Sequence, residues 1–196
     1  MKSGEVSASA ERSPRGFVLW MTGLPASGKS TIALLAKQRL EADYGRHVEL
    51  LDGDEVRKGL SSDLGLSRED REEHARRVSY LAKVLARNGV ISIVALISPY
   101  RTSRQRAREL IGEDDFVEVF VKASLATCEK RDPKGLYAKA RRGEINNMTG
   151  IQDPYEEPVS PEIVIDTEST TPERSTDTLL SILAKRLTAA PGPAND

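Results

Sequence analysis

The chain has 196 residues, a length that suits a single domain with a sizeable core. Lys and Arg together number 29 and Asp and Glu 30, so no overall basic field draws the chain to nucleic acid or to an acidic membrane surface. The single cysteine, Cys128, excludes an internal disulfide framework and a cysteine-based metal site. Such sparse cysteine usage is typical of a reducing compartment, and we expect a cytoplasmic protein.

The two ends of the chain lack the patterns of folded elements. Residues 1–15 are polar, without the apolar centre of a secretory signal, and residues 189–196 carry Ala, Pro and Gly without periodicity. We expect both to be disordered tails around one domain of residues 16–188. The longest apolar runs, near residues 18–21 and 90–97, are too short to span a bilayer, so no membrane-spanning segment is predicted.

Between these tails, short β-branched runs alternate with longer amphipathic segments. The predicted strands are Phe17–Met21, His47–Leu51, Val90–Ile97, Phe116–Val121 and Ile163–Ile165. The predicted helices are Lys29–Ala42, Arg68–Asn88, Thr102–Ile111, Ser124–Arg131 and Pro172–Leu187. Several strands are apolar almost throughout, as strands covered on both faces are. This order predicts a three-layer α/β/α sandwich around a mostly parallel sheet.

One long segment, residues 132–158, interrupts the alternation. Glycines and prolines punctuate its many charged residues, and no strand or helix is predicted within it. A long irregular insertion in a compact domain is typical of a lid that closes over a functional site. The alternative is a surface loop without a function.

A phosphate-binding motif follows the first predicted strand. Residues 23–30 match the pattern G-x-x-x-x-G-K-[ST] and open the first predicted helix. In such a loop the glycines let successive backbone N–H groups point at phosphate oxygens, and the helix N-terminus adds partial positive charge. We predict that this phosphate loop binds a nucleotide through Gly23, Leu24, Pro25, Ala26, Ser27, Gly28, Lys29, Ser30 and Thr31.

Two members of the phosphate loop have specific expected roles. Lys29 is expected to bridge the β- and γ-phosphates, and the Ser30 hydroxyl to help hold Mg²⁺. The alternative, a glycine-rich turn that binds nothing, does not explain why the motif lies between a strand and a helix. The loop alone does not identify the group that receives the phosphate.

Acidic and basic side chains follow the second predicted strand, in the sequence Leu51-Asp52-Gly53-Asp54-Glu55-Val56-Arg57. Ligands of open α/β sheets bind at this carboxyl edge. Asp54 is a candidate to orient an acceptor hydroxyl and take its proton, or to hold a water on Mg²⁺, and Arg57 is a candidate clamp for an anion. The alternative is an ordinary acidic turn that caps a helix.

Other classes of nucleotide-binding protein carry sequence motifs that this chain lacks. No Asn-Lys-x-Asp motif of a GTPase is present, and the strand at residues 90–97 ends in Ser98-Pro99-Tyr100-Arg101 instead of the carboxylate typical of a motor ATPase. These features favour a kinase that acts on a small molecule.

Five stretches together resemble one family, the adenylylsulfate (APS) kinases. They are the phosphate loop, residues 51–57, Ile97-Ser98-Pro99-Tyr100-Arg101, residues 131–137, and residues 149–151 followed by 153–156, in family order across residues 16–187. The resemblance implies a P-loop fold of the nucleotide-kinase type. It also implies that MgATP phosphorylates the ribose 3′-hydroxyl of adenosine 5′-phosphosulfate, giving 3′-phosphoadenosine 5′-phosphosulfate (PAPS).

The resemblance also implies roles on the acceptor side. Asp54 becomes the general base or a carboxylate beside Mg²⁺, and Arg57 and Arg71 grip the phosphosulfate. Lys134 and the backbone of Ile97 and Ser98 line the acceptor site.

Ser98 occupies the position recorded as a phosphoserine intermediate in bacterial members of the family. Direct transfer to the ribose hydroxyl needs no such intermediate, so a backbone-positioning role for Ser98 is the alternative. On the ATP side, Arg131 is expected to stack on the adenine and Arg141 to reach the phosphates as the lid closes. The family further implies a homodimer and a functional pairing with an ATP sulfurylase.

Three positions depart from the family pattern around the expected acceptor nucleoside. Leu66 stands where an aromatic residue often stacks on the adenine, His74 replaces an asparagine, and Met148 replaces a phenylalanine. Leu and Met offer area without an aromatic face, so weaker stacking is expected. A sister kinase with another acceptor, or a non-catalytic nucleotide-binding module, therefore remains as an alternative. For His74 the alternative is a solvated position on a charged helix face.

Overall fold

The computed structural model describes residues 15–188, which build a fully parallel five-stranded sheet. The strands are β1 (Val18–Thr22), β2 (Val48–Asp52), β3 (Ile91–Ala95), β4 (Phe116–Lys122) and β5 (Ile163–Asp166). Their order across the sheet is β2-β3-β1-β4-β5, and every neighbouring pair is parallel. The five predicted strands are confirmed to within two residues at each end.

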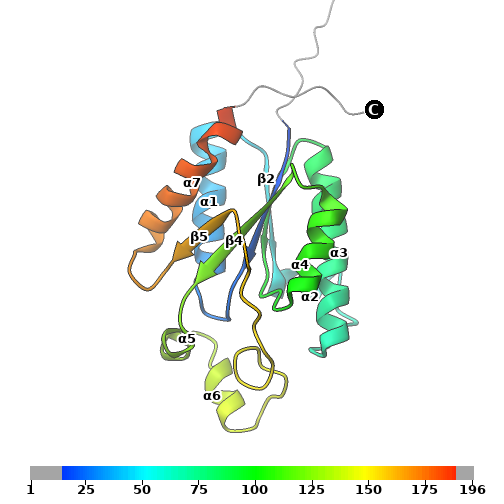
Figure 1. Cartoon of the computed structure of the whole chain (residues 1–196), viewed down its shortest axis with the longest axis vertical. Helices are drawn as coiled ribbons and strands as arrows, with labels where there is room; N and C mark the ends of the chain where they lie inside the picture. Colours follow the sequence, from blue (N-terminus) through cyan, green and yellow to red (C-terminus); the bar gives the residue numbers. More distant parts are fainter. Residues whose placement is uncertain (1–14, 189–196) are drawn as a thin grey trace, which may run out of the picture.

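Helices cover both faces of this sheet. The helices of the described residues are α1 (Lys29–Tyr44), α2 (Gly53–Lys58), α3 (Arg68–Arg87), α4 (Arg101–Ile111), α5 (Leu125–Arg131), α6 (Leu136–Arg141) and α7 (Pro172–Thr188). Helices α1 and α7 lie on one face and α3 and α4 on the other, as Figure 1 shows. The predicted three-layer α/β/α sandwich is therefore confirmed.

The alternation of side chains along β1 explains why both faces need a covering layer. Leu19 and Met21 pack into the apolar core under α1 and α7. Val18 and Trp20 point the other way, into the core under α3 and α4. All five residues of β1 are buried, because the central strand of the sheet has no solvent-facing side.

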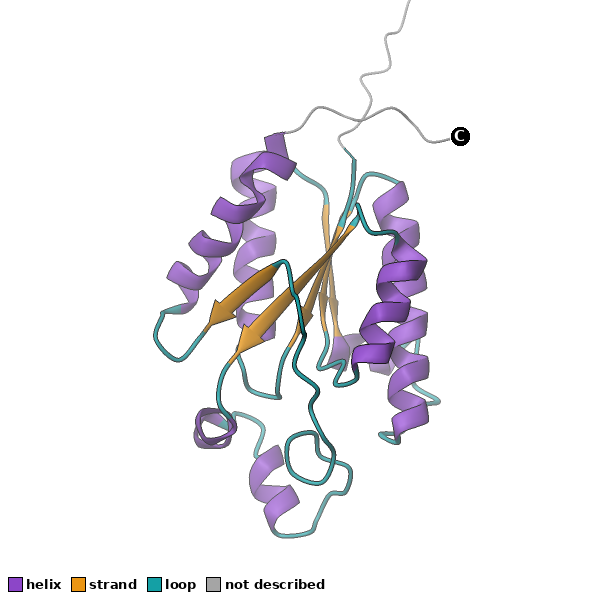
Figure 2. Cartoon of the chain, in the orientation of Figure 1, coloured by secondary structure: helices purple, strands orange, loops and turns teal. Residues whose placement is uncertain are grey.

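Two short helices lie where the sequence predicts none (Figure 2). Helix α2 begins after Asp52, whose side chain accepts a hydrogen bond from the Asp54 amide, so the acidic turn is also a helix cap. Helix α6 lies inside the 132–158 segment, between Gly135 and Gly143. The expectation that this whole segment is irregular is therefore wrong. Each helix has six residues, too few for a hydrophobic period to appear in the sequence.

The expected tails fall almost entirely outside the described residues. Arg15 is the exception, and its guanidinium forms a hydrogen bond of 2.9 Å with the Asp115 carboxylate. Among residues 15–188, no helix combines the length and the apolar character that crossing a membrane requires.

Because all strands are parallel, their carboxyl ends meet at one edge of the sheet. The loops after β1, β2 and β3 emerge there, and α5, α6 and the rest of the 132–158 segment lie beyond the same edge in Figure 1. This edge positions the candidate site, as expected for an open α/β sheet.

Candidate active site

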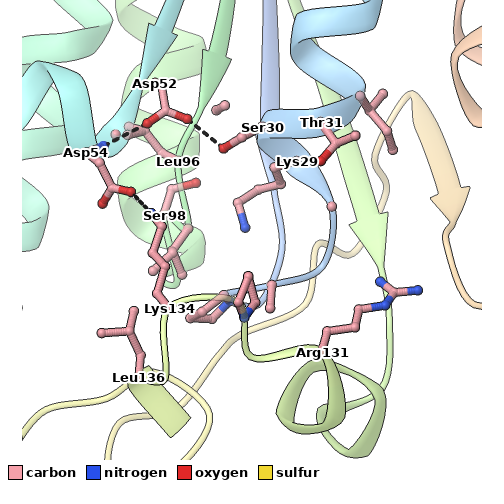
Figure 3. A pocket seen from close by; sticks show the side chains of 18 of the residues that line it. Lys29, Ser30, Thr31, Asp52, Asp54, Leu96, Ser98, Arg131, Lys134 and Leu136 are labelled. Atoms are coloured by element: carbon pink, nitrogen blue, oxygen red, sulfur yellow. Dashed lines mark hydrogen bonds and ion pairs between the residues drawn. The ribbon is translucent and has the colours of Figure 1, made fainter. Parts of the chain in front are cut away.

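A cavity of about 600 Å³ opens at the carboxyl edge of the sheet. Its walls come from the phosphate loop, the loops after β2 and β3, residues 131–137, and residues 167–175. The volume lies within the range of roughly 300–1,000 Å³ typical of sites for small molecules and cofactors. Figure 3 shows side chains from these segments converging on the cavity.

The backbone of the phosphate loop adopts conformations that depend on its composition. A Cβ atom at Gly23 would lie 2.4 Å from the Val121 carbonyl oxygen, so this position requires glycine. Gly28 has φ 103° and immediately precedes α1, and Ala26 has φ 62°. The loop thus curls around the N-terminus of α1, the arrangement that points backbone N–H groups at an anion.

The Lys29 side chain folds back into the phosphate loop. Its Nζ donates hydrogen bonds to the carbonyl oxygens of Gly23 (2.9 Å) and Leu24 (2.8 Å) and to Ser27 Oγ (3.4 Å). The residue is only 8% exposed, and burial lowers the pKa of its ammonium group to about 8. A buried cation at the centre of the loop is suited to hold phosphate oxygens.

Two carboxylates lie beside the phosphate loop, at and just beyond the end of β2. Ser30 Oγ donates a hydrogen bond of 2.6 Å to Asp52 Oδ2, and the amide of Asp54 donates one of 3.0 Å to Asp52 Oδ1. Asp54 in turn pairs with Lys134, as the dashed lines in Figure 3 show. Sequence reasoning proposed Ser30 and Asp54 as the metal residues and missed Asp52, which contacts Ser30 directly. The signal for Asp52 was its place as the last residue of a strand at the ligand-binding edge.

The 132–158 segment makes several contacts with the rest of the site. Lys134 reaches across the cavity to Asp54, and the Tyr137 hydroxyl donates a hydrogen bond of 3.0 Å to the Pro25 carbonyl oxygen. An apolar cluster of Tyr137 and neighbouring residues of the segment packs on Leu24 and Ala26. The segment therefore lies directly against the phosphate loop.

At the other side of Asp54, two arginines and a histidine line the cavity. Arg57 Nη1 donates to the Gly65 carbonyl oxygen (2.9 Å), and Arg71 Nη2 donates to that of Asn147 (2.7 Å), which joins α3 to the 132–158 segment. Burial lowers the pKa of both arginines. These two cations concentrate positive charge at this end of the cavity, in a chain with almost no net charge, and such a site is suited to an anion.

His74 lines the cavity and is buried, at 5% exposure, so the alternative of a solvated helix position is excluded. Its Nδ1 lies 2.9 Å from Ser61 Oγ, and its Nε2 has no hydrogen-bond partner among residues 15–188. Burial, followed by the charges of Arg57 and two other arginines, lowers the pKa of the imidazole to about 4. The ring is therefore neutral at pH 7, and its Nε2 is a buried polar atom of a residue that lines the cavity.

The lowered pKa of His74 leads us to expect that the stability of the protein depends on pH. A folded-state pKa of about 4, below the ordinary value of 6.5, means that stability is lost as pH falls from 6.5 toward 4. Replacing His74 with Asn removes that titration. Between pH 7 and pH 5, the Tm of His74→Asn should therefore fall by roughly 4–7 °C less than that of the wild type in a thermal melt. The exposed His47 provides the matched control, His47→Asn, which should follow the wild type. Equal pH dependence in all three proteins would contradict the assignment.

Ser98 lies in the turn after β3 and lines the same cavity. Its backbone has φ 36°, a conformation that residues other than glycine rarely adopt. Its hydroxyl is buried and accepts a hydrogen bond of 3.1 Å from Trp20 Nε1, while the Ile97 carbonyl oxygen accepts one of 2.7 Å from Thr22. Both predicted residues, Ile97 and Ser98, thus belong to the wall of the site.

Outside the phosphate loop, three predicted residues do not line the cavity. Leu66 is 46% exposed, and Met148 is buried in the apolar cluster with Tyr137 and Cys128. Arg141 pairs with Glu129, 2.5 Å away, on an exposed surface. None of the three lines the cavity as the structure describes it.

The far end of the cavity holds Arg131 and residues that sequence reasoning missed. Arg131 donates hydrogen bonds to the Thr167 carbonyl oxygen (2.6 Å) and hydroxyl (3.0 Å), and the Thr167 hydroxyl donates to the Ser27 carbonyl oxygen (2.8 Å). Thr170, Pro172 and Ser175 line this end too. Their only sequence signal was their position just after the last strand of a parallel sheet.

Comparison with known proteins identifies relatives with the same architecture. The family model for adenylylsulphate kinase matches residues 15–166. An adenylyl-sulfate kinase of Oceanobacillus iheyensis is 51% identical over 169 residues, which are 86% of this chain and 84% of that protein.

Solved structures agree with this result. An APS kinase of Mycobacterium tuberculosis, in complex with AMPPNP and APS, has 42% identity and a TM-score of 0.84 over 87% of this chain and 99% of that one. A hexameric APS kinase of Thiobacillus denitrificans has 34% identity and a TM-score of 0.67 over 88% of this chain and 29% of that one. With a family model matched over most of its length and relatives of this identity, the chain belongs to the adenylylsulphate kinase family.

Proposed function

We propose that this protein phosphorylates the ribose 3′-hydroxyl of APS with ATP, giving PAPS and ADP. One observation carries the proposal: a single cavity joins the phosphate loop, through Asp54, to the anion site formed by Arg57 and Arg71. A phosphate donor and an anionic acceptor would thus meet at a carboxylate. The M. tuberculosis relative that was solved with AMPPNP and APS supports the same pair of ligands here.

ATP would lie along the phosphate loop, with its phosphates on the loop amides and Lys29. The adenine would lie toward Arg131 and the Thr167 end of the cavity. Ser30, Asp52 and Asp54 present the oxygen ligands that Mg²⁺ prefers, and one or two carboxylates together with substrate phosphates suffice for this ion. When bound, Mg²⁺ would neutralise charge on the β- and γ-phosphates.

On the acceptor side, Arg57 and Arg71 would bind the phosphosulfate, and the turn at Ile97 and Ser98 would support the nucleoside. Asp54 would accept the proton of the 3′-hydroxyl as that oxygen bonds to the γ-phosphorus and the bond from phosphorus to the ADP oxygen breaks. For this step Asp54 must exchange its partner Lys134 for the substrate hydroxyl. Lys134 would then be free to contact the acceptor.

The 132–158 segment would serve as a lid on the single domain of residues 16–188. Its contacts from Lys134 to Asp54, from Tyr137 to Pro25, and from Asn147 to Arg71 span both substrate sites. A segment bound at both sites can exclude water once both ligands are present.

Assembly and cellular context are part of the proposal. We expect the chain to form a homodimer, and self-association is supported by the hexameric relative. We also expect it to work in the cytoplasm beside an ATP sulfurylase, the class of enzyme that makes APS from ATP and sulfate.

The lowered pKa of Lys29 leads us to expect that the protein takes up protons when ATP binds. With a pKa of about 8 in the ligand-free protein, about half of the Lys29 side chains are neutral at pH 8, and phosphate charge favours the protonated form. Titration calorimetry at pH 8 in buffers of different ionisation enthalpy should show uptake of roughly half a proton per ATP. Lys29→Arg, which stays charged, should show almost none. Uptake that is absent in the wild type, or equal in the two proteins, would refute the assignment.

The acceptor is tested by measuring initial rates of ADP formation with APS, adenosine 5′-phosphate and other phosphorylated small alcohols. The anion site predicts that kcat/KM for APS exceeds that for adenosine 5′-phosphate by at least about tenfold, because the sulfate adds a charged contact. A preference for a non-sulfated acceptor would instead identify a sister kinase. Tight ATP binding without turnover of any acceptor would identify a non-catalytic module.

A further inference from the structure

A buried arginine outside the cavity connects two parts of the site. Arg104 lies on α4 and is only 3% exposed. Its three guanidinium nitrogens donate to three acceptors at 2.7 Å each: Nε to Glu118 Oε1, Nη1 to the Ser98 carbonyl oxygen, and Nη2 to the Glu156 carbonyl oxygen. A buried charge with every nitrogen bonded in this way is strongly constrained in position.

The three acceptors belong to separate parts of the fold. Glu118 lies on β4, Ser98 belongs to the turn that lines the cavity, and Glu156 lies where the chain leaves the 132–158 segment. Glu118 balances the charge of Arg104 inside the protein. Arg104 is therefore connected to the site through its hydrogen bonds to the carbonyl oxygens of Ser98 and Glu156. We call Ser98, Arg104 and Glu156 the clasp.

Further hydrogen bonds connect the same two segments. The Glu156 amide donates to the Pro99 carbonyl oxygen (2.8 Å), and the Glu156 carboxylate accepts from the Arg101 amide (2.8 Å) at the start of α4. The Arg101 side chain donates to the Glu157 carbonyl oxygen (2.8 Å). The end of the 132–158 segment is thus fixed to the turn after β3.

The conformation of Ser98 explains why this turn needs such support. A positive φ at a residue other than glycine is strained and persists only where neighbouring contacts hold it. Arg104 holds the Ser98 carbonyl oxygen, and Trp20 holds its hydroxyl. Thr22 also contacts the turn, through the Ile97 carbonyl oxygen. Loss of the Arg104 contact therefore weakens this support, so that the turn can relax and the cavity wall can shift.

We propose that Arg104 is a positioning residue that fixes the acceptor wall at Ser98 and the end of the lid at Glu156 in one geometry. This inference rests on the proposed function. It predicts that damage to the clasp affects the acceptor and the transfer step while ATP binding stays intact, because Arg104 does not contact the phosphate loop.

The test replaces Arg104 with Lys, which keeps the charge but cannot donate in three fixed directions. Arg108→Lys is the matched control, since Arg108 lies on the same helix, pairs with Glu162 and lies near Glu118, but contacts neither Ser98 nor Glu156. For Arg104→Lys, kcat/KM for APS should fall at least about tenfold while KM for ATP changes less than about twofold. Arg108→Lys should keep both constants within about twofold of the wild type at a comparable loss of Tm.

Hydrogen exchange measured without substrates separates this inference from the proposed function. In Arg104→Lys the Glu156 and Arg101 amides should exchange faster than in the wild type and in Arg108→Lys, whatever the acceptor is. If Arg104→Lys does not fold, Glu118→Gln takes its place, with the same expected selective loss toward APS and faster exchange. If the wild type does not phosphorylate APS, the proposed function fails while exchange still tests the clasp. Equal exchange and equal kinetic losses in the clasp and control variants would overturn the inference.

Discussion

Lys29→Ala should lower kcat by roughly 10³-fold while the protein remains folded. The ammonium group lies inside the phosphate loop, bonded to Gly23 and Leu24, where the β- and γ-phosphates of ATP would replace those carbonyl contacts. Without this ammonium group, the phosphate loop offers no preorganised cation to stabilise the negative charge that develops on the transferring phosphoryl group. Steady-state rates with ATP and APS measure the loss, and circular dichroism checks the fold.

The control for this variant lies on the same helix. Lys37→Ala removes a lysine that forms a surface pair with Glu41, 3.7 Å away, and such pairs contribute little to stability. It should keep wild-type rates. If Lys29→Ala retained more than about a tenth of the wild-type kcat, Lys29 would lack the assigned role.

Asp54→Asn should lower kcat by roughly 10²–10⁴-fold, the usual contribution of a general base. The Asp54 side chain is 68% exposed, so the substitution leaves the core unchanged. Asn has nearly the same shape but cannot accept the proton of the 3′-hydroxyl, and it no longer attracts Lys134. Single-turnover rates, measured with enzyme in excess over APS, isolate the transfer step from product release.

The neighbouring residue supplies the comparison. Glu55 is equally exposed on α2 and pairs with Lys58, 2.8 Å away, so Glu55→Gln should leave the single-turnover rate unchanged. A wild-type rate in Asp54→Asn would refute the proposed base. Equal losses in both variants would indicate that the general negative charge of α2, and not Asp54 itself, matters.

The main architecture could be predicted from the sequence because parallel strands buried on both faces are almost continuously apolar. Strands β1 and β3, buried along their whole length, are examples. Helix α3 could be predicted equally well, because its buried positions repeat at helical spacing. Helices α2 and α6 have only six residues each and depend on a cap and on tertiary contacts, which local patterns do not reveal.

In the candidate site, too, some residues could be predicted from the sequence and others could not. The phosphate loop is one contiguous motif, so its place in the cavity followed from the sequence. The contact of Ser30 with Asp52, and that of Thr167 with Ser27, join residues that are far apart in the chain, and no local signal reports them. The family resemblance placed Leu66 and Met148 at the acceptor, but the chain turns one toward solvent and the other into an apolar cluster.

In the proposed reaction, the γ-phosphate of ATP is transferred to the 3′-oxygen of APS. The most direct test is incubation of the wild-type protein with MgCl₂, APS and ATP labelled at the γ-phosphate, followed by mass analysis and digestion with a 3′-nucleotidase. We predict a product heavier than APS by one phosphate group, from which the 3′-nucleotidase releases the label and regenerates APS. Label that resists this digestion, or ADP formed without any phosphorylated APS, would contradict the claim.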